Sequence, residues 1–377
     1  MRLIGVDLAT VTPLYMAGAT QEPELRPPSF RGALRFWWRA LWGSTHGDDW
    51  PRMAKDEASI FGDTQRASCV ILRLDGRGTQ ESEEVDTEGK EGLQYLLWAF
   101  GVEGEQKGRA AFLADHTTFR LSLARRPAGD LHGDSTAPLL QAAAALWLLV
   151  NFGGVGTRAR RGFGSLRPLH APRGWPEILP PLTNSAETPE QLATYLSQGI
   201  SEARSALGWD LVTVSQEPAF NLLHPTACTV VVWDRTWDSW QAALNAIGGE
   251  LKRSRSRTSP DNTGVLAVIE GEPPPKTVTR AAFGLPLPFY YPHIKRGATV
   301  VPDGDRVNRR ASPLLFKVAP LGNGLVTVVM TFFRARFVPS AKLQIQPKGG
   351  TPVIVDEPGY SAVDAFVSNL ATLPVKL

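Results

Sequence analysis

Apolar and polar residues alternate along three short segments of the first half of the chain, and a period of two predicts β-strands. Other segments carry apolar side chains three or four positions apart, which predicts helices with one buried face. In chain order, the predicted elements are a strand at 2–16, helices at 30–44 and 53–61, strands at 67–74 and 117–124, and a helix at 137–152. The last helix is apolar nearly all round, so we expect it to be buried. This order predicts a β-α-β-β-α-β unit.

The second half repeats the strand–helix–strand order without visible sequence repetition. Its predicted elements are helices at 187–207 and 236–251, strands at 227–234, 283–290, 312–318 and 324–337, and a final helix at 360–372. Residues 171–190 are rich in proline and polar side chains, which is typical of a boundary between domains. We therefore predict two α+β domains, at 1–180 and 181–377.

The composition agrees with two folded domains. A length of 377 residues is too great for one small domain. Apolar residues make up 43% of the chain and charged residues 20%, which excludes a disordered protein. The net charge is only +3, so any binding of nucleic acid must depend on where the basic residues cluster.

The cysteines and the apolar runs indicate the compartment. Cys69 and Cys228 lie far apart and lack metal-ligand spacing, which argues against a disulfide framework and a zinc site. Free thiols fit a reducing cytoplasm. The N-terminal residues lack a signal-peptide pattern, and the longest apolar run, at 139–152, is shorter than the ~20 residues that span a bilayer. We expect a soluble cytoplasmic protein with no membrane partner, no metal and no cofactor.

Five glycines and three arginines fall within residues 153–164, which we call the glycine–arginine loop. Glycines let a backbone adopt positive φ and approach another chain closely. Neighbouring N–H groups can form a concave anion site, and arginines between them can donate paired hydrogen bonds to phosphate. The segment lacks the Gly-Lys-Ser/Thr of a Walker A loop, and it trails a helix, unlike a dinucleotide fingerprint. The alternative interpretation is a tight helix-to-strand turn with solvated arginines.

A second basic feature lies on the predicted helix at 30–44. Arg31, Arg35 and Arg39 recur every fourth residue, so they form a stripe along one face, and such a stripe can follow a nucleic-acid backbone. Gly32 costs about 1 kcal/mol within a helix, which predicts that another element or RNA passes close to it. The alternative is a solvated polar face. We expect core burial, in preference to base stacking, for Trp37, Trp38 and Trp42.

These stretches together resemble a known family. The first runs from TPLYMAGA through ELRPPSFRGALRFWWRAL to IFG, and the second is GGVGTRARRGFGSL. The second half adds FGLPLPF near residue 283 and RRASPLLFKV near residue 309. With these motifs the sequence resembles the first subunit of the Cmr complex of type III-B CRISPR systems, in the RAMP superfamily. Residues 171–280 and 340–377 carry no sharp motif of that family.

The resemblance implies two ferredoxin-like, RRM-related RAMP domains with antiparallel sheets and helices packed on one face. It also implies an RNA-binding structural subunit of a ribonucleoprotein in antiviral defence. Its partners would be CRISPR RNA, target RNA and other RAMP subunits, and its place would be near the 3′ end of the guide, with cleavage left to other subunits. The expected RNA contacts are Arg26, Arg31, Arg35, Arg39, Gly153, Gly154, Gly156, Arg158, Arg160, Arg161, Gly162, Gly164, Arg309 and Arg310.

The alternative function is a metal-independent endoribonuclease that processes CRISPR repeat RNA, with a histidine as general base. Of the six histidines, His46 is the best candidate for this general base, because it lies just after the arginine-bearing helix. No Tyr or Lys partner can be assigned to it, so a surface histidine is the favoured interpretation. Asp48 and Asp49 beside it are weak evidence for a metal site. A third alternative is a protein adaptor that touches RNA only incidentally.

One further basic run remains open at the level of sequence. Lys252, Arg253, Arg255 and Arg257 fit a phosphate clamp and a solvated, mobile loop equally well.

Overall fold

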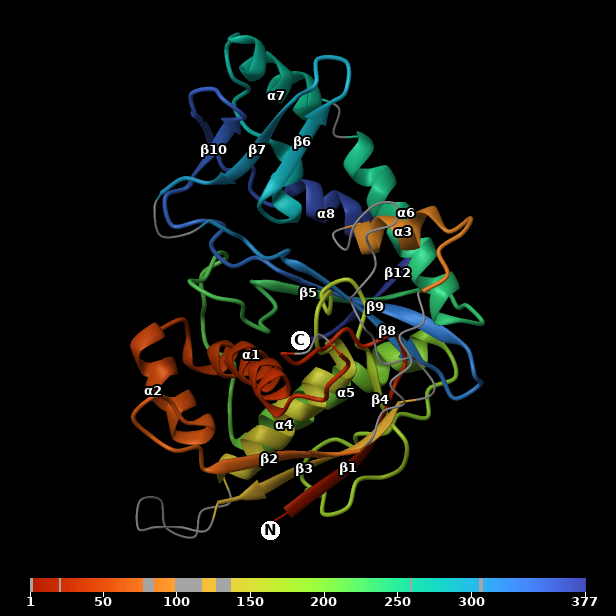
Figure 1. Cartoon of the computed structure of the whole chain (residues 1–377). Coiled ribbons are helices and arrows are strands. Elements are labelled where there is room, and N and C mark those ends of the chain that lie inside the picture. Colours follow the sequence, from red (N-terminus) through yellow and green to blue (C-terminus); the bar gives the residue numbers. More distant parts are fainter. Residues whose placement is uncertain are drawn as a thin grey trace.

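Three four-stranded antiparallel sheets follow one another through the molecule, with helices packed between them (Figure 1). The computed structural model describes residues 3–19, 22–76, 85–98, 117–126, 137–257, 260–304 and 308–377. Within these residues, no helix is both long enough and apolar enough to cross a lipid bilayer.

The first sheet has the strand order of a ferredoxin-like unit. It consists of β1 (Leu3–Thr10), β2 (Val70–Asp75), β3 (Thr118–Arg125) and β4 (Leu166–Pro168), in the order β2-β3-β1-β4. The helices that cover it are α1 (Pro27–His46), α2 (Trp50–Phe61) and α4 (Ala137–Phe152) (Figure 1). The predicted β-α-β-β-α-β unit is therefore confirmed. α1 begins three residues earlier than its pattern predicts, because Pro27 and Pro28 occupy the first helical positions, where proline's fixed φ is favourable.

The second sheet repeats this order. Its strands are β5 (Cys228–Trp233), β8 (Leu314–Pro320), β9 (Val326–Phe333) and β12 (Thr372–Val375), in the order β12-β5-β9-β8. Helices α6 (Trp240–Arg257) and α8 (Ser361–Ser368) accompany it, and α6 packs against the short α3 (Glu91–Leu97). The α+β fold with antiparallel sheets is confirmed. The final helix is shorter than predicted, since the chain ends it at Ser368 and returns as β12.

Insertions into the second unit form the third sheet, of which the sequence pattern predicts one strand, at 283–290. Its strands are β6 (Leu287–Tyr291), β7 (Arg296–Pro302), β10 (Lys342–Pro347) and β11 (Val353–Asp356), in the order β11-β10-β7-β6. α7 (Pro260–Glu270) and a 3-10 turn (Thr279–Phe283) lead into it. The basic run at 252–257 is the end of α6 and not a loop, so that interpretation of the run is wrong.

The second sheet lies between two hydrophobic cores. On β9, Val329 and Phe333 belong to the core shared with the first sheet, whereas Met330 and Phe332 belong to the core on the other side. A strand exposes alternate side chains to opposite faces, so a strand that is apolar throughout can serve both cores. α5 (Pro189–Leu207) also buries its apolar face in the first core. The two halves therefore share the first of the two cores.

Candidate nucleic-acid interface

The glycine–arginine loop joins the two halves of the molecule. It leaves the end of α4 and passes along β8 before it reaches β4. The Phe316 N–H donates a 3.2 Å hydrogen bond to the Arg160 carbonyl, and Arg160 Nη1 donates one of 2.6 Å to the Ser312 carbonyl. Thr12 Oγ1 donates to the Gly162 carbonyl at 2.8 Å. Hydrogen bonds to Thr12 on one side and to Ser312 and Phe316 on the other thus hold the loop in place.

Its glycines are required by contacts within the protein. Gly156 has φ +82°, and a Cβ there would lie 2.5 Å from the Tyr15 carbonyl oxygen. At Gly164, with φ +64°, a Cβ would lie 1.9 Å from the Val155 carbonyl oxygen. Gly153, Gly162 and Gly164 are buried. The expectation that all five glycines contact RNA is therefore corrected: the buried ones allow tight packing of the loop itself.

The arginines of the loop face a groove of about 800 Å³ between the two halves. Its walls come from α3, the loop, α6 and the segments around residues 280–288 and 309–312. No aspartate or glutamate is among the described residues that line it. Seven arginines do line it, and we call this site the arginine groove: Arg158, Arg160, Arg161, Arg255, Arg280, Arg309 and Arg310.

Burial and the repulsion between neighbouring positive charges lower the pKa values of Arg160 and Arg161. Burial lowers the pKa of Arg160 to about 10, with a further contribution from Arg310. Burial lowers the pKa of Arg161 to about 9, and the positive charges of Arg158, Arg255 and Arg160 add to the effect. A nearby negative charge stabilises the charged form of an arginine whose pKa is lowered in this way. The groove is therefore a site that favours an anion.

Several guanidinium nitrogens in the groove are not satisfied by the protein. Arg158 donates to the Leu96 carbonyl and Arg310 Nη2 to the Tyr360 hydroxyl at 2.6 Å. Yet one buried nitrogen in each of four side chains has no hydrogen-bond partner within the described chain, namely Arg158 Nε, Arg161 Nη1, Arg280 Nε and Arg310 Nε. Buried polar groups are nearly always paired in proteins, so this cluster is a candidate binding site.

Arg309 offers the most accessible charge of the groove. It is exposed and makes no hydrogen bond or ion pair within the described residues. Aromatic rings lie among the arginines: Trp98 lines the groove with 55% of its surface exposed, and Arg255 lies over the Tyr95 and Phe283 rings at 5.8 and 5.9 Å. Aromatic faces beside cations are typical of sites for nucleic-acid bases.

A second hollow adjoins the arginine groove at the loop. It measures about 430 Å³ and shares Gly156 and Ala159 with the groove. Arg26, at the N-terminal end of α1, lines it together with Ser29. Arg26 is exposed and donates to the Ala17 carbonyl at 3.4 Å. The two hollows therefore form one path across the loop, with Arg26 at one end.

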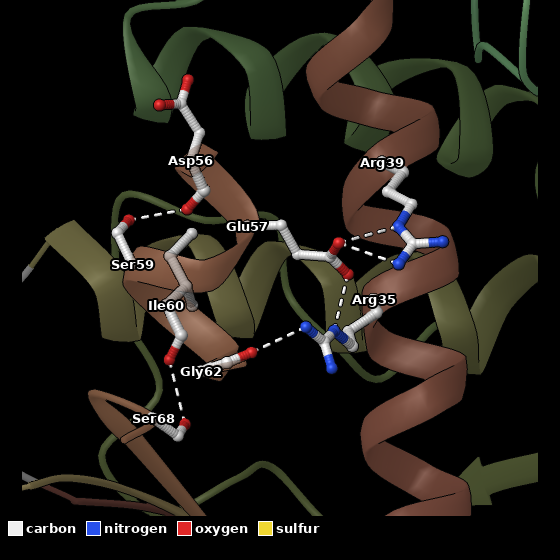
Figure 2. Close-up of polar contacts among 8 residues, drawn as sticks. All are labelled: Arg35, Arg39, Asp56, Glu57, Ser59, Ile60, Gly62 and Ser68. Atoms are coloured by element: carbon white, nitrogen blue, oxygen red, sulfur yellow. Dashed lines mark hydrogen bonds and ion pairs between the residues drawn. The ribbon is translucent and has the colours of Figure 1, made fainter. Parts of the chain in front are cut away.

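The arginine stripe of α1 does not join this path. Arg35 Nε lies 2.7 Å from Glu57 Oε1 and Arg39 Nη2 lies 2.8 Å from Glu57 Oε2, so both cations hold one buried carboxylate on α2 (Figure 2). Arg35 also donates to the Gly62 carbonyl at 2.7 Å. These arginines fasten α2 to α1, a role that the sequence does not reveal because Glu57 lies on another helix.

Helix geometry turns the first two arginines of the stripe away from the glycine–arginine loop. Arg160 lies 5.2 Å over the Phe36 ring, so the Phe36 side of α1 faces the loop. At 100° per residue, Arg31 and Arg35 point well away from that side. The stripe and the loop, which were both expected to contact RNA, therefore do not line one groove. Among the described residues, no other element lies within 4 Å of a Cβ built at Gly32, so of the two predicted neighbours only RNA stays a prediction.

The tryptophans of α1 and His46 pack inside the protein. Trp37, Trp38 and Trp42 are buried, which confirms the prediction of core burial. The His46 ring stacks on Trp42 at 4.7 Å and meets Trp209 edge-on at 5.1 Å. Burial lowers the pKa of His46. His46 is half-buried and does not line the arginine groove.

Some groove residues are not identified by the sequence. Arg280 lies in no basic run and becomes part of the site only because the 3-10 turn brings it to the loop. Arg255 comes from the ambiguous basic run, and its neighbours Lys252 and Arg253 instead pair with Glu91 and Glu250. A helix turns alternate residues of such a run to different sides.

Comparisons with known proteins agree with the geometry. The RAMP superfamily matches this sequence over residues 7–167. The chain is 25% identical to Cmr subunit Cmr1-1 of Pyrococcus furiosus over 371 residues, which cover 98% of this chain and 95% of that protein. It is 30% identical to Cmr1-2 of the same organism over 174 residues, which cover 43% of this chain and 92% of that protein.

Solved structures share the fold. Cmr1 from Pyrococcus furiosus in its apo form matches with a TM-score of 0.67 and 22% identity, over 100% of this chain and 99% of that one. A chain of the type III-B Cmr-beta complex bound to cognate target RNA matches with a TM-score of 0.52 and 12% identity, over 88% and 94%. Because the chain is 30% identical to Cmr1-2 over 92% of that protein and shares the fold of Cmr1, it belongs to the Cmr1 family of the RAMP superfamily.

Proposed function

We propose that this chain is an RNA-binding structural subunit of a type III-B CRISPR effector ribonucleoprotein. It holds CRISPR RNA and target RNA near the 3′ end of the guide, in antiviral defence in the cytoplasm. The observation that carries this proposal is the arginine groove, with seven arginines and no carboxylate among its described lining residues. A phosphate backbone supplies the negative charge that this groove lacks.

The geometry favours contacts to the sugar–phosphate backbone over contacts to base edges. Arginines donate to phosphate in paired geometry, and such contacts position a nucleic acid without reading its sequence. In an RNA-guided complex, base pairing supplies the sequence specificity. The exposed face of Trp98, beside the arginines, provides a surface on which any base can stack.

The relatives support the assembly part of the proposal. The two curated relatives are named as subunits of a Cmr system, and one similar chain comes from a Cmr complex that is bound to cognate target RNA. We propose other RAMP subunits as the protein partners. Holding a backbone needs no general base, and His46 lies outside the groove, so we assign the chain no catalytic step.

The test measures binding of three unrelated single-stranded RNAs to the purified chain by fluorescence anisotropy at fixed salt. The triple variant Arg158→Ala, Arg160→Ala and Arg161→Ala is compared with the wild-type chain, and so is Arg309→Ala, which removes only an exposed side chain. Arg253→Ala on α6 is the matched control, since Arg253 lies outside the groove and pairs with Glu250.

We expect the triple variant to lose affinity about tenfold or more, and to lose it equally for all three RNAs. Arg309→Ala should weaken binding less and should lower the dependence of log K on log salt by about 0.7 per lost phosphate contact. Unchanged affinity, or a loss confined to one RNA sequence, contradicts the proposal. Cleavage of repeat RNA that disappears in His46→Ala establishes the endoribonuclease instead.

A further inference from the structure

The third sheet has one open face, at the opposite end of the molecule from the first sheet (Figure 1). α7 packs against β6, β7 and β10 on the other face, where the Tyr291 hydroxyl donates to the Asn262 carbonyl at 2.6 Å. Side chains alternate between the two faces of a strand, so Pro288 and Tyr290 of β6 point away from α7. Both are exposed, and Tyr290 has 64% of its surface exposed. A large aromatic side chain therefore stands on the open face.

Tyr290 and a lysine flank a position that has no side chain. Gly297 of β7 lies directly opposite Tyr290, and the Lys348 N–H donates to the Gly297 carbonyl at 2.9 Å from the other side. Opposite residues of antiparallel strands share a face, so Tyr290, Gly297 and Lys348 form one row across the open face. A Cβ at Gly297 would lie 3.6 Å from Tyr290 Cδ2, so the ring borders the gap that the glycine leaves.

The end of the sheet at this row carries an excess of positive charge. Residues 286–302 and 343–355 supply β6, β7, most of β10 and part of β11, and they contain no aspartate or glutamate. They contain three basic residues, all exposed and without an ion pair within the described residues, namely Lys295, Arg296 and Lys348. Asp303 and Asp356, the next carboxylates along the chain, accept hydrogen bonds from side chains at the opposite end of the sheet. The charge of this end therefore attracts an anion.

β6 leads from the arginine groove to this row. Pro288 lines the groove, and Arg280, a groove arginine, lies 5.1 Å over the ring of Phe289 on β6. β6 is an edge strand of its sheet. Pro288 belongs both to the groove and to the open face, and Tyr290 is the next residue of β6 on that face. A nucleic-acid strand that leaves the groove along β6 therefore meets Tyr290 and then Lys348.

We propose that Tyr290 and Lys348, with Lys295 in the adjoining turn, form a second contact site for single-stranded nucleic acid, the β6 platform. The strand that fills the arginine groove continues along β6, one of its bases stacks on the Tyr290 ring, and Lys348 binds the adjoining phosphate. Every base has a π-face and lysine binds phosphate as a point charge, so the platform does not read sequence. The inference rests on the proposed function, because the groove supplies the start of the path.

The length of the RNA separates the platform from the groove. Fluorescence anisotropy measures the affinity of the full chain for a single-stranded RNA of about 4 nucleotides and for one of about 12 nucleotides. We expect Tyr290→Ala to weaken binding of the long RNA about tenfold, because one stacked base is lost, and to leave binding of the short RNA unchanged. Tyr290→Phe keeps the ring and should bind both RNAs as the wild type does. Ile354→Ala, which also removes an exposed side chain of the open face, is the matched control.

Two further measurements distinguish direct contact from a change in the fold. Lys348→Gln should lower the dependence of log K on log salt for the long RNA by about 0.7, the slope of one phosphate contact to a single strand. Lys342→Gln, at the other end of β10 and paired with Asp356, should leave this slope unchanged. A long RNA in which abasic sites replace the bases should bind the wild type and Tyr290→Ala equally, since it has nothing to stack.

The comparison with the groove variants decides between the two proposals. If Arg158→Ala, Arg160→Ala and Arg161→Ala together weaken both RNAs while Tyr290→Ala changes neither, the platform is refuted and the proposed function stands. If only the platform variants weaken binding, the groove fails and the path from it fails with it. An equal loss for short and long RNA in Tyr290→Ala also overturns the platform. Unchanged RNA affinity, together with reduced incorporation of Tyr290→Ala into the assembly purified from native cells, assigns the face to a protein partner instead.

Discussion

Arg160 Nη1 lies 2.6 Å from the Ser312 carbonyl oxygen, although 152 residues separate the two in sequence. The loop that carries Arg160 belongs to the first ferredoxin-like unit, and Ser312 precedes a strand of the second. The arginine groove is therefore formed only when the two halves pack together. Any ligand of the groove must stabilise that packing.

RNA should raise the thermal stability of the chain. Binding to the folded state alone adds about 2.7 kcal/mol to the free energy of unfolding when RNA is present at 100 times its dissociation constant. We expect differential scanning fluorimetry to show a rise in melting temperature with RNA, and no rise for the triple variant Arg158→Ala, Arg160→Ala and Arg161→Ala. An equal rise in both proteins contradicts the assignment of the groove.

Gly156→Ala should destabilise the fold. Its φ of +82° and the Tyr15 carbonyl oxygen, 2.5 Å from the added Cβ, leave no room for a side chain. We expect a loss of about 2–4 kcal/mol in the free energy of unfolding, measured with urea. Gly32→Ala on α1 is the control: no other described element lies within 4 Å of its Cβ, so the substitution should stabilise the fold by about 0.5–1 kcal/mol. If Gly156→Ala leaves the free energy of unfolding unchanged, the loop can make room for the added Cβ and the prediction is wrong.

Glu57→Gln should loosen α2 from α1. Glu57 is nearly buried, with 4% of its side chain exposed, while Arg35 and Arg39 are 29% and 36% exposed. Because water partly screens these cations, we expect a loss of about 1–3 kcal/mol rather than the larger cost of a fully buried pair. Urea unfolding measures this loss. RNA affinity should stay unchanged, and a change would indicate that the stripe contributes to binding.

Lys317 should make stability depend on pH. It is 2% exposed on β8, and its Nζ donates to the Leu166 carbonyl at 2.5 Å. Burial lowers its pKa to about 7, whereas in the unfolded chain it stays near 10.5. Between these values the unfolded chain binds one more proton than the folded chain, so folding stability rises with pH, by up to about 1.4 kcal/mol per pH unit.

The control for this pH dependence is Lys317→Met. In that variant, the contribution of Lys317 to the slope between pH 7 and 10 should disappear, while the titrations of other groups remain. Urea unfolding at four pH values in this range measures both proteins. Parallel curves for the wild type and the variant contradict a neutral buried Lys317.

The repeating pattern of apolar positions suffices to predict the first unit. The period of two in its strands and the all-apolar helix at Ala137–Phe152 are local properties of the sequence, so β2, β3 and α4 are found close to their predicted bounds. β1 begins where predicted but ends at Thr10, well before residue 16. The third sheet, apart from the strand predicted at 283–290, is not predictable in this way. Its strands are short insertions separated by other elements, and only tertiary packing pairs β7 with β10.

The residues of the candidate site also divide into those that the sequence identifies and those that it does not. The glycine–arginine loop is recognisable because glycines and arginines stand close together in the chain. Arg280 is not recognisable, since it is an isolated residue that the fold brings to the groove. The α1 stripe is misinterpreted because its partner, Glu57, lies on another helix, and an ion pair between helices leaves no periodic trace in either one.

The most direct test of the central claim is to map where RNA touches the protein. Single-stranded RNA that contains 4-thiouridine is crosslinked to the full chain by light, and the crosslinked peptides are identified by mass spectrometry. The proposed function predicts crosslinks to peptides of the glycine–arginine loop, of α3 around Trp98 and of residues 309–312. Crosslinks confined to the outer face of α1 and α2, around Arg31, would contradict it.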